Sequence, residues 1–237
     1  MVFDQSEYNI RCEWGENGVS LLAPISDVVI IVDVISFSTA VEIATNRGAL
    51  VYPFQWKDET AHEFAKSVAA EVADKRNPNG YSLSPASLQA VPSGLRLVLA
   101  SPNGSELSLL TGSIPAIAGC LRNSRAVAES AMRRGRNVAV IPAGERWEDG
   151  TLRPCLEDLA GAGSIMRYLR GTPSPEARAA MAVFESVASS LFEHLKSSSS
   201  GKEKMSRGEE SDIILASDLD CSDCVPVLTD GAYRREV

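Results

Sequence analysis

Long apolar runs are missing from this 237-residue sequence, and none approaches the roughly 20 residues that a helix needs to span a bilayer. The first residues, MVFDQSEYNIRCEW, have neither the basic start nor the apolar core of a signal peptide. We therefore expect a cytoplasmic protein that makes no membrane contact.

Basic residues are also few relative to acidic ones: the sequence has 23 Lys and Arg and 31 Asp and Glu, so the formal net charge is −8. The densest basic run, Arg133, Arg134 and Arg136, lies at the end of an expected helix, where cations complement the helix dipole. A nucleic-acid surface needs clustered Lys and Arg, so we expect no nucleic-acid partner. An anionic substrate would need local cations or a metal ion to offset the overall charge.

The sequence has only two histidines and five scattered cysteines, an odd number that argues against a disulfide framework. Cys221 and Cys224 form one C-x-x-C motif, but His62 and His194 lie far from it, and zinc usually requires four such ligands. A redox C-x-x-C motif usually begins a helix, but here Pro226 lies just beyond the second cysteine. A zinc or redox protein centred on this motif is kept as a third hypothesis.

Short apolar runs alternate along the chain with longer segments of helical spacing. We expect strands at 28–32, 49–54, 95–100, 114–119 and 137–143, and helices at 38–46, 57–74, 123–134, 155–170 and 174–196. The Ser-rich, charged stretch near 197–211 is typical of a flexible connection. This alternation predicts one α/β domain over 1–237, a three-layer α/β/α fold with a largely parallel or mixed central sheet.

Polar residues follow the expected strands, where ligands of such sheets bind. Asp33 and the hydroxyls of Ser36, Ser38 and Thr39 follow the first strand. The other polar residues at this edge are Asn103, Gly104, Ser105, Arg122, Asn123, Glu157 and Asp158.

Backbone amides at helix starts and glycine turns, together with hydroxyls and an arginine, form an anion site. Carboxylates beside it would repel the anion unless a cation bridges them, and Mg²⁺ commonly joins carboxylates to phosphate oxygens. The set therefore predicts Mg²⁺ and a phosphate. Structural interpretations stay open: Asp33 as a helix cap, Asn103–Gly104 as a turn, Glu157 and Asp158 as dipole partners, and Arg122 as a surface charge.

Several phosphatase mechanisms do not match the sequence. A D-x-D motif fails because Ile35 stands at its second position, and Cys120 to Arg125 is one residue short of the cysteine-phosphatase loop C-x₅-R. No P-loop motif is present. Metal-assisted attack by water is the simplest remaining mechanism.

At these residues the chain resembles the ComB family of 2-phosphosulfolactate phosphatases. The matching segments, in the family's order from Val32 to Ile165, are VDVISFSTA, GYSLSP, SPNGS, CLRNSRAVA, IPAGERW and CLEDLAGAGSI. The later CVPVLTDGAY resembles the family's closing segment. The resemblance implies a Mg²⁺-dependent phosphatase of three-layer α/β/α fold. The family's reaction hydrolyses 2-phospho-3-sulfolactate to 3-sulfolactate and phosphate, a step towards coenzyme M.

Carried over by motif, the resemblance matches the family's strand-end aspartate to Asp33 and its N-G turn to Asn103 and Gly104. Its later asparagine matches Asn123, and its E-D pair matches Glu157 and Asp158. The chain departs from the family at Ser36, where many members have an arginine. Arg122, Arg125 and Arg146 are the candidates to replace that charge.

The first hypothesis is a Mg²⁺-dependent phosphatase acting on 2-phospho-3-sulfolactate or a similar small anionic phosphorylated acid. Its expected catalytic residues are Asp33 and Asp158, and its expected Mg²⁺ ligands are Asp33, Glu157 and Asp158. The expected substrate-binding residues are Ser36, Ser38, Thr39, Asn103, Gly104, Ser105, Arg122 and Asn123. The second hypothesis is a non-catalytic phosphate-ligand binding protein on the same scaffold. A homo-oligomer is left open.

Overall fold

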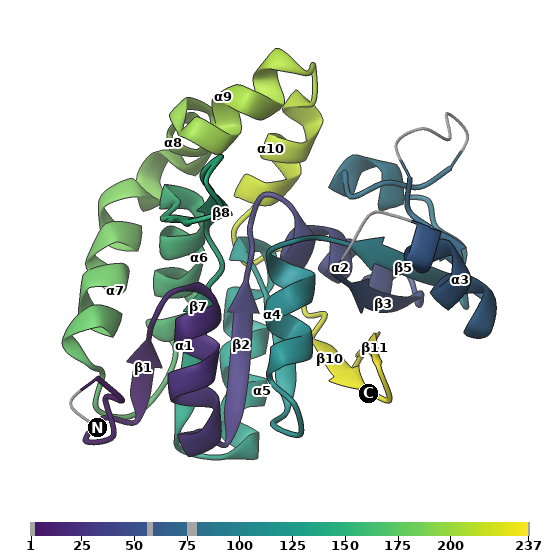
Figure 1. The fold of residues 1–237 in the computed structure, drawn as a ribbon. Coiled ribbons are helices and arrows are strands. Elements are labelled where there is room, and N and C mark those ends of the chain that lie inside the picture. The colour runs from purple at the N-terminus through teal and green to yellow at the C-terminus, as the bar shows by residue number, and fades with distance from the viewer. Residues whose placement is uncertain (1–2, 56–58, 75–79, 237) are drawn as a thin grey trace.

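The computed structural model describes residues 3–55, 59–74 and 80–236. Its main feature is a nine-stranded sheet in the order β1-β7-β2-β6-β10-β11-β3-β5-β4, with β8 and β9 as a separate hairpin (Figure 1). The strands are β1 (Ile10–Cys12), β2 (Val28–Val32), β3 (Leu50–Phe54), β4 (Glu71–Val72), β5 (Arg96–Ala100), β6 (Ala116–Gly119), β7 (Val138–Pro142), β8 (Glu145–Arg146), β9 (Leu152–Arg153), β10 (Pro226–Thr229) and β11 (Ala232–Arg235).

Helices flank this sheet, and they are α1 (Gly15–Leu22), α2 (Phe37–Asn46), α3 (Glu59–Ser67), α4 (Gly104–Leu110), α5 (Ser124–Arg134), α6 (Leu156–Met166), α7 (Pro175–Val187), α8 (Leu191–Ser197), α9 (Ser199–Ser206) and α10 (Glu210–Ser217). The β1, β7, β2 and β6 strands pair in parallel, as do β3, β5 and β4. The β10–β11 hairpin pairs antiparallel with both groups. The predicted α/β fold with a mostly parallel, mixed sheet is confirmed. Within the described residues, no helix has the length and apolar character needed to cross a membrane.

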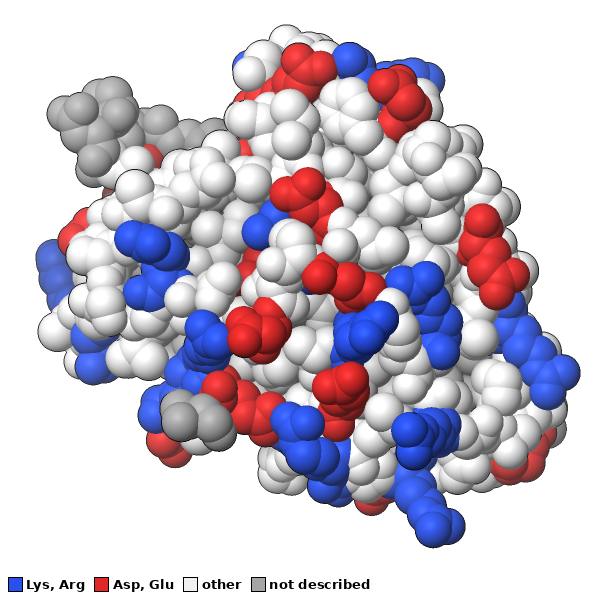
Figure 2. Space-filling view, turned by 180° about the vertical axis from the view of Figure 1, so that it is seen from behind, with Lys and Arg blue, Asp and Glu red and all other residues white. Residues whose placement is uncertain are grey.

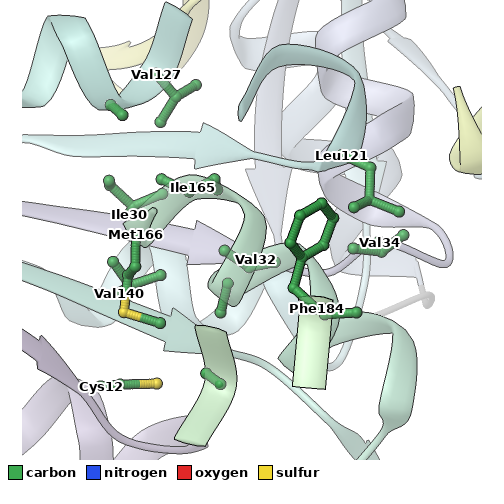
Figure 3. Packing of buried hydrophobic residues seen from close by; sticks show 14 of the residues in the cluster. Cys12, Ile30, Val32, Val34, Leu121, Val127, Val140, Ile165, Met166 and Phe184 are labelled. Atoms are coloured by element: carbon green, nitrogen blue, oxygen red, sulfur yellow. The ribbon is translucent and has the colours of Figure 1, made fainter. Parts of the chain in front are cut away.

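Strand β2 is buried on both faces, and its alternating side chains supply two layers of core. Val28, Ile30 and Val32 pack with residues of α5, α6 and α7, including Phe184 (Figure 3). Val29 and Ile31 face the opposite way and pack with residues of α1 and α4. Because both faces are covered, the polar end of β2 is fixed firmly within the fold.

The β10–β11 hairpin joins the two groups of parallel strands. Val227 pairs with Ile117 of β6, and Tyr233 pairs with Val51 of β3. Tyr233 is fully buried, donates a hydrogen bond from its hydroxyl to Ser108 Oγ at 2.7 Å, and packs edge-on against Phe37. The last strands of the chain therefore complete a core that begins at the start of α2.

Two expected helices differ from the structure. Of the helix expected at 57–74, residues 57–58 lie outside the described residues, and α3 ends at Ser67 before β4 pairs with β5. The helix expected at 174–196 is interrupted by a 3-10 turn at Ala188–Ser190, between α7 and α8. Local helical spacing does not reveal either interruption.

The flexible connection expected near 197–211 is a third difference, because this segment contains α9 and the start of α10. The Ser198 hydroxyl caps α9 by accepting a hydrogen bond from Gly201 N at 3.1 Å. Gly201 and Lys204 are buried against the rest of the fold. Packing of one face of a polar sequence thus decides its structure, which composition alone did not indicate.

Candidate active site

A pocket of about 230 Å³ lies beyond the carboxyl ends of β2 and β5 and is walled by α9. Figure 1 shows α9 above the carboxyl end of β2. The lining residues are Asp33, Ile35, Ser36, Leu83, Ser101, Pro102, Asn103, Glu145, Ser200, Glu203, Lys204 and Arg207. Three of the predicted site residues, Asp33, Ser36 and Asn103, therefore meet at one pocket.

Asp33 sits where α2 and α4 both begin. Its Oδ1 accepts a hydrogen bond from Phe37 N at 3.1 Å, and its Oδ2 accepts one from Gly104 N at 3.0 Å. The side chain is almost completely buried, and this burial raises its pKa although the two amide hydrogen bonds act in the opposite direction. A carboxylate that follows a buried strand is thus held rigidly by two helix starts.

Asp158, in the first turn of α6, joins two loops of the site. Its Oδ1 accepts a hydrogen bond from Val34 N at 2.7 Å, and its Oδ2 accepts one from Gly144 N at 2.8 Å. Burial raises its pKa well above the ordinary value, and the charges of Asp33 and Glu157 add to the effect. Asp158 does not line the pocket. Asp158 therefore holds the loop after β2 and the loop after β7 in position relative to each other.

Three of the predicted substrate-binding hydroxyls are fully buried and bound to backbone carbonyl groups. Ser38 Oγ donates to Ile31 O at 3.0 Å, Thr39 Oγ1 donates to Val34 O at 2.8 Å, and Ser105 Oγ donates to Leu99 O at 2.8 Å. Gly104 contributes its amide to Asp33 rather than to the pocket lining. These residues shape the loops that hold Asp33, and the expectation that they contact the ligand is not supported.

Glu145 is a site residue that the sequence reasoning missed, although it lies in the IPAGERW segment. Its Oε2 accepts a hydrogen bond from Asn103 Nδ2 at 2.8 Å. Burial raises the pKa of Glu145 to about 7, and the nearby charge of Asp33 adds to the rise. An acidic residue just after the end of a central strand was the signal that could have identified it.

Arg122 and Asn123 were expected to bind substrate, but neither lines the pocket. Arg122 Nε lies 2.6 Å from Glu42 Oε2, a fully buried carboxylate of α2, and its Nη1 binds Asp218 at 3.0 Å. Asn123 Oδ1 accepts a hydrogen bond from the backbone amide of Cys120, in the connection between β6 and α5. Its Nδ2 donates a hydrogen bond to Cys224 O at 2.9 Å. Both side chains are used to tie separate chain segments together.

The other two arginines considered as replacement cations also lie outside the pocket lining. Arg125 packs over the Tyr168 ring at 5.0 Å from its centre. Arg146 is paired with Glu16 and with Glu106, the latter at 2.7 Å. Around the whole surface seen in Figure 2, Lys and Arg side chains are interspersed with Asp and Glu.

Two carboxylates, Asp33 and Glu145, line the pocket near the strand ends, and Glu157 and Asp158 lie outside its lining but close enough to interact with them electrostatically. Coulombic repulsion among them contributes to the raised pKa values of Asp33, Glu145 and Asp158. Hard oxygen donors with excess negative charge suit Mg²⁺.

Among the described residues, however, no three His, Cys, Asp or Glu side chains are arranged as a metal cluster, so the predicted trio Asp33, Glu157 and Asp158 is not preassembled. Mg²⁺ is commonly held by only one or two carboxylates together with substrate phosphate. Asp33 and Glu145, which reach the pocket, fit that requirement by their chemistry.

The C-x-x-C motif lies apart from the pocket lining, and both of its thiols are free. Burial raises the pKa of Cys224 to about 12 and raises the pKa of Cys221 as well. Reactive and metal-binding cysteines need the thiolate form, which a raised pKa disfavours. The structure therefore gives no support to a zinc or redox centre at this motif.

Comparison with known proteins gives a consistent result over most of the chain. The model of the 2-phosphosulpholactate phosphatase family matches residues 19–231. A probable 2-phosphosulfolactate phosphatase of Thermotoga petrophila is 28% identical over 225 residues, covering 90% of this chain and 96% of that protein. A protein of Thermotoga maritima with the same description is 29% identical over the same shares.

Proposed function

This chain belongs to the 2-phosphosulpholactate phosphatase family, and we propose that it is a Mg²⁺-dependent phosphatase. Its proposed substrate is 2-phospho-3-sulfolactate or a similar small phosphorylated acid, which it hydrolyses to the hydroxy acid and phosphate. A cytoplasmic location and a role in coenzyme M synthesis are parts of the same proposal. The observation that carries it is the buried Asp33 carboxylate, held by two helix starts at the floor of a pocket that also contains cations.

Asp33 would hold the metal ion, which needs only one or two carboxylates besides the phosphate oxygens of the substrate, and this leaves Glu145 free to accept a proton. When bound, Mg²⁺ supplies positive charge against the phosphoryl oxygens. Ser36 lines the pocket, where its hydroxyl can donate a hydrogen bond to the ligand. Asn103 is positioned by its hydrogen bond to Glu145 and presents the rest of its amide to the pocket.

The reaction transfers the phosphoryl group to water and releases the hydroxy acid. A carboxylate in the pocket must accept a proton from the attacking water, and a base works best when its pKa lies near the working pH. Glu145 meets this requirement, because burial raises its pKa to about 7. Asp158 would act indirectly, by keeping the loops after β2 and β7 in place.

The proposal is tested by phosphate release from 2-phosphosulfolactate and phospholactate, measured with Mg²⁺ and with EDTA. We expect release that requires Mg²⁺ and that falls by at least about 100-fold in Asp33→Asn. Asp27→Asn is a matched control. The Asp27 carboxylate also accepts two backbone amides, from Arg136 and Asn137, but precedes β2 at the opposite edge of the sheet. Full activity of Asp33→Asn would contradict the assignment.

The same assay separates the phosphatase from a phosphate-ligand binding protein. A binding protein would gain thermal stability from the phosphorylated acids and release no phosphate while folded and supplied with Mg²⁺. That result would replace the enzymatic proposal.

A further inference from the structure

The positive charge of the pocket comes from α9. Among the described lining residues, Lys204 and Arg207 are the cations, while Asp33, Glu145 and Glu203 are the acids. Within the described part of the lining, a substrate that carries a phosphoryl group and further acidic groups therefore meets cations on this wall alone. Local sequence did not predict these cations as pocket residues, because the segment resembles a flexible connection.

Lys204 is a fixed charge. Its Nζ lies 2.8 Å from Asp212 Oδ2 and 2.9 Å from Glu209 Oε2, and its side chain is 10% exposed. Its charge acts at Asp33, where it lowers the pKa that burial raises. Lys204 Nζ is thus committed to the acids of α10 and the α9–α10 turn, which leaves Arg207 as the cation of this wall that can rearrange for a ligand.

Arg207 is held much more loosely. Its side chain is 52% exposed, and it is paired with Glu203 one turn earlier, whose side chain is 51% exposed. Exposed pairs of this spacing contribute little to stability because water screens them. The guanidinium can therefore leave Glu203 for a ligand at small cost. Its planar fork is suited to bind two oxygens of a sulfonate or carboxylate at once.

We propose that Arg207, supported by the fixed charge of Lys204, binds the second acidic group of the substrate, while the phosphoryl group lies at Asp33. This inference rests on the proposed function, since it assigns the part of the pocket that distinguishes highly acidic substrates from simpler phosphomonoesters. Ser36 supplies a hydroxyl in the same pocket but no charge. Arg207 is accordingly a specificity-determining residue, and α9 is the recognition wall.

The test compares Arg207→Ala with Lys202→Ala, a matched control that removes an exposed cation of the same helix outside the pocket lining. Three substrates distinguish the acidic group: 2-phosphosulfolactate, phospholactate, which lacks the sulfonate, and a phosphorylated hydroxyethanesulfonate, which lacks the carboxylate. We expect Arg207→Ala to raise KM about 10-fold or more for substrates carrying the recognised group, with little change in kcat. Lys202→Ala should behave as the wild type.

Two further variants sharpen the result. Arg207→Lys should recover part of the lost affinity, because it restores the charge without the fork. Glu203→Gln should lower KM, because it removes the acid that competes for the guanidinium. Equal KM values for Arg207→Ala and Lys202→Ala with all three substrates, in a series where the wild type releases phosphate, would overturn the inference alone.

A binding measurement keeps the two proposals separable. If the wild type releases no phosphate, the proposed function fails, and binding of 3-sulfolactate measured by calorimetry still tests Arg207. Weaker binding to Arg207→Ala than to Lys202→Ala would support the recognition wall. Equal binding to both variants, or no binding to the wild type, would overturn it.

Discussion

Asp33 and Asp158 are alike in their local contacts, because each carboxylate accepts two hydrogen bonds from backbone amides and each is buried. Only Asp33 lines the pocket. The two residues differ in which amides they bind. Asp33 binds the first amides of α2 and α4, whereas Asp158 binds amides of the loops after β2 and β7 and lies outside the pocket lining. Reactivity at this site is therefore decided by access to the pocket rather than by residue type.

Glu145 provides a prediction for the metal-free protein. Burial raises its pKa from 4.5 to about 7, so over this range the folded protein keeps a proton that the unfolded chain has released. The contribution of Glu145 to wild-type stability therefore falls as pH rises from about 4.5 to about 7. Glu145→Gln removes this loss while its amide oxygen can still accept from Asn103. We expect a higher Tm than wild type near pH 8 in EDTA, by about 2–4 °C for each kcal/mol relieved.

The control for this effect is Glu148→Gln, which removes an exposed carboxylate next to the same hairpin. Its Tm should follow the wild type at both ends of the pH range. Below about pH 4, where Glu145 is protonated in the folded and the unfolded chain, Glu145→Gln and wild type should converge. A Tm gain that stays constant with pH would show that packing, not charge, is responsible.

At the scale of elements, α9 is the segment whose placement matters most for the site. It carries three of the residues that line the pocket wall, Ser200, Glu203 and Lys204, and a fourth, Arg207, follows directly as its C-cap. Its approach to α8 depends on Gly201, because a Cβ there would lie 1.8 Å from the carbonyl oxygen of Leu195. Such a contact cannot be relieved by a side-chain rotation, since the opposing atom belongs to the backbone.

Gly201→Ala should therefore displace α9 from α8. We expect a lower Tm together with a KM increase for the acidic substrate, because the recognition wall moves while Asp33 stays in place. Ser199→Ala, at an exposed position of the first turn of the same helix, is the control and should leave both quantities near wild type. Thermal unfolding and steady-state kinetics measure the two effects. An unchanged KM in a destabilised Gly201→Ala would show that the wall does not contact substrate.

At the scale of the whole molecule, the chain's last hairpin holds the two groups of parallel strands together. Tyr233 lies at this junction, where it packs against Phe37 at the start of α2 and binds Ser108 of α4. Both helices donate an amide to Asp33 at their first turn. The carboxylate of the site is thus coupled to residues that lie 200 positions later in the sequence, at Tyr233.

Two substitutions at Tyr233 separate packing from hydrogen bonding. Tyr233→Phe keeps the ring and should cost about 1 kcal/mol of unfolding free energy through the lost hydroxyl. Tyr233→Ala leaves a cavity and should cost about 3–5 kcal/mol. Urea unfolding measures both, and kcat should fall in Tyr233→Ala alone because the starts of α2 and α4 loosen. Equal stability of the two variants would contradict a packing role for the ring.

The central features of the fold could be predicted from local sequence patterns. Val28–Val32 is an apolar run that is buried on both faces and can form a central strand, and Asp33 directly after it was recognised as a site residue. Ser36 and Asn103 were found in the same way, because parallel strands bring their carboxyl ends to one edge. The motif order from Val32 to Ile165 identified the family that the comparison confirms.

Which polar side chains line the pocket depends on long-range packing. Arg122 forms a buried ion pair with Glu42, which lies 80 residues earlier in the sequence. Because its guanidinium is used in this pair, Arg122 does not line the pocket. Lys204 and Arg207 enter the pocket because α9 packs across the ends of the strands, although their local sequence has no motif. Such partners are chosen by burial and charge between segments far apart in the chain. The sequence pattern of a single strand or helix shows its local periodicity, but it does not show which distant segments will pack against it.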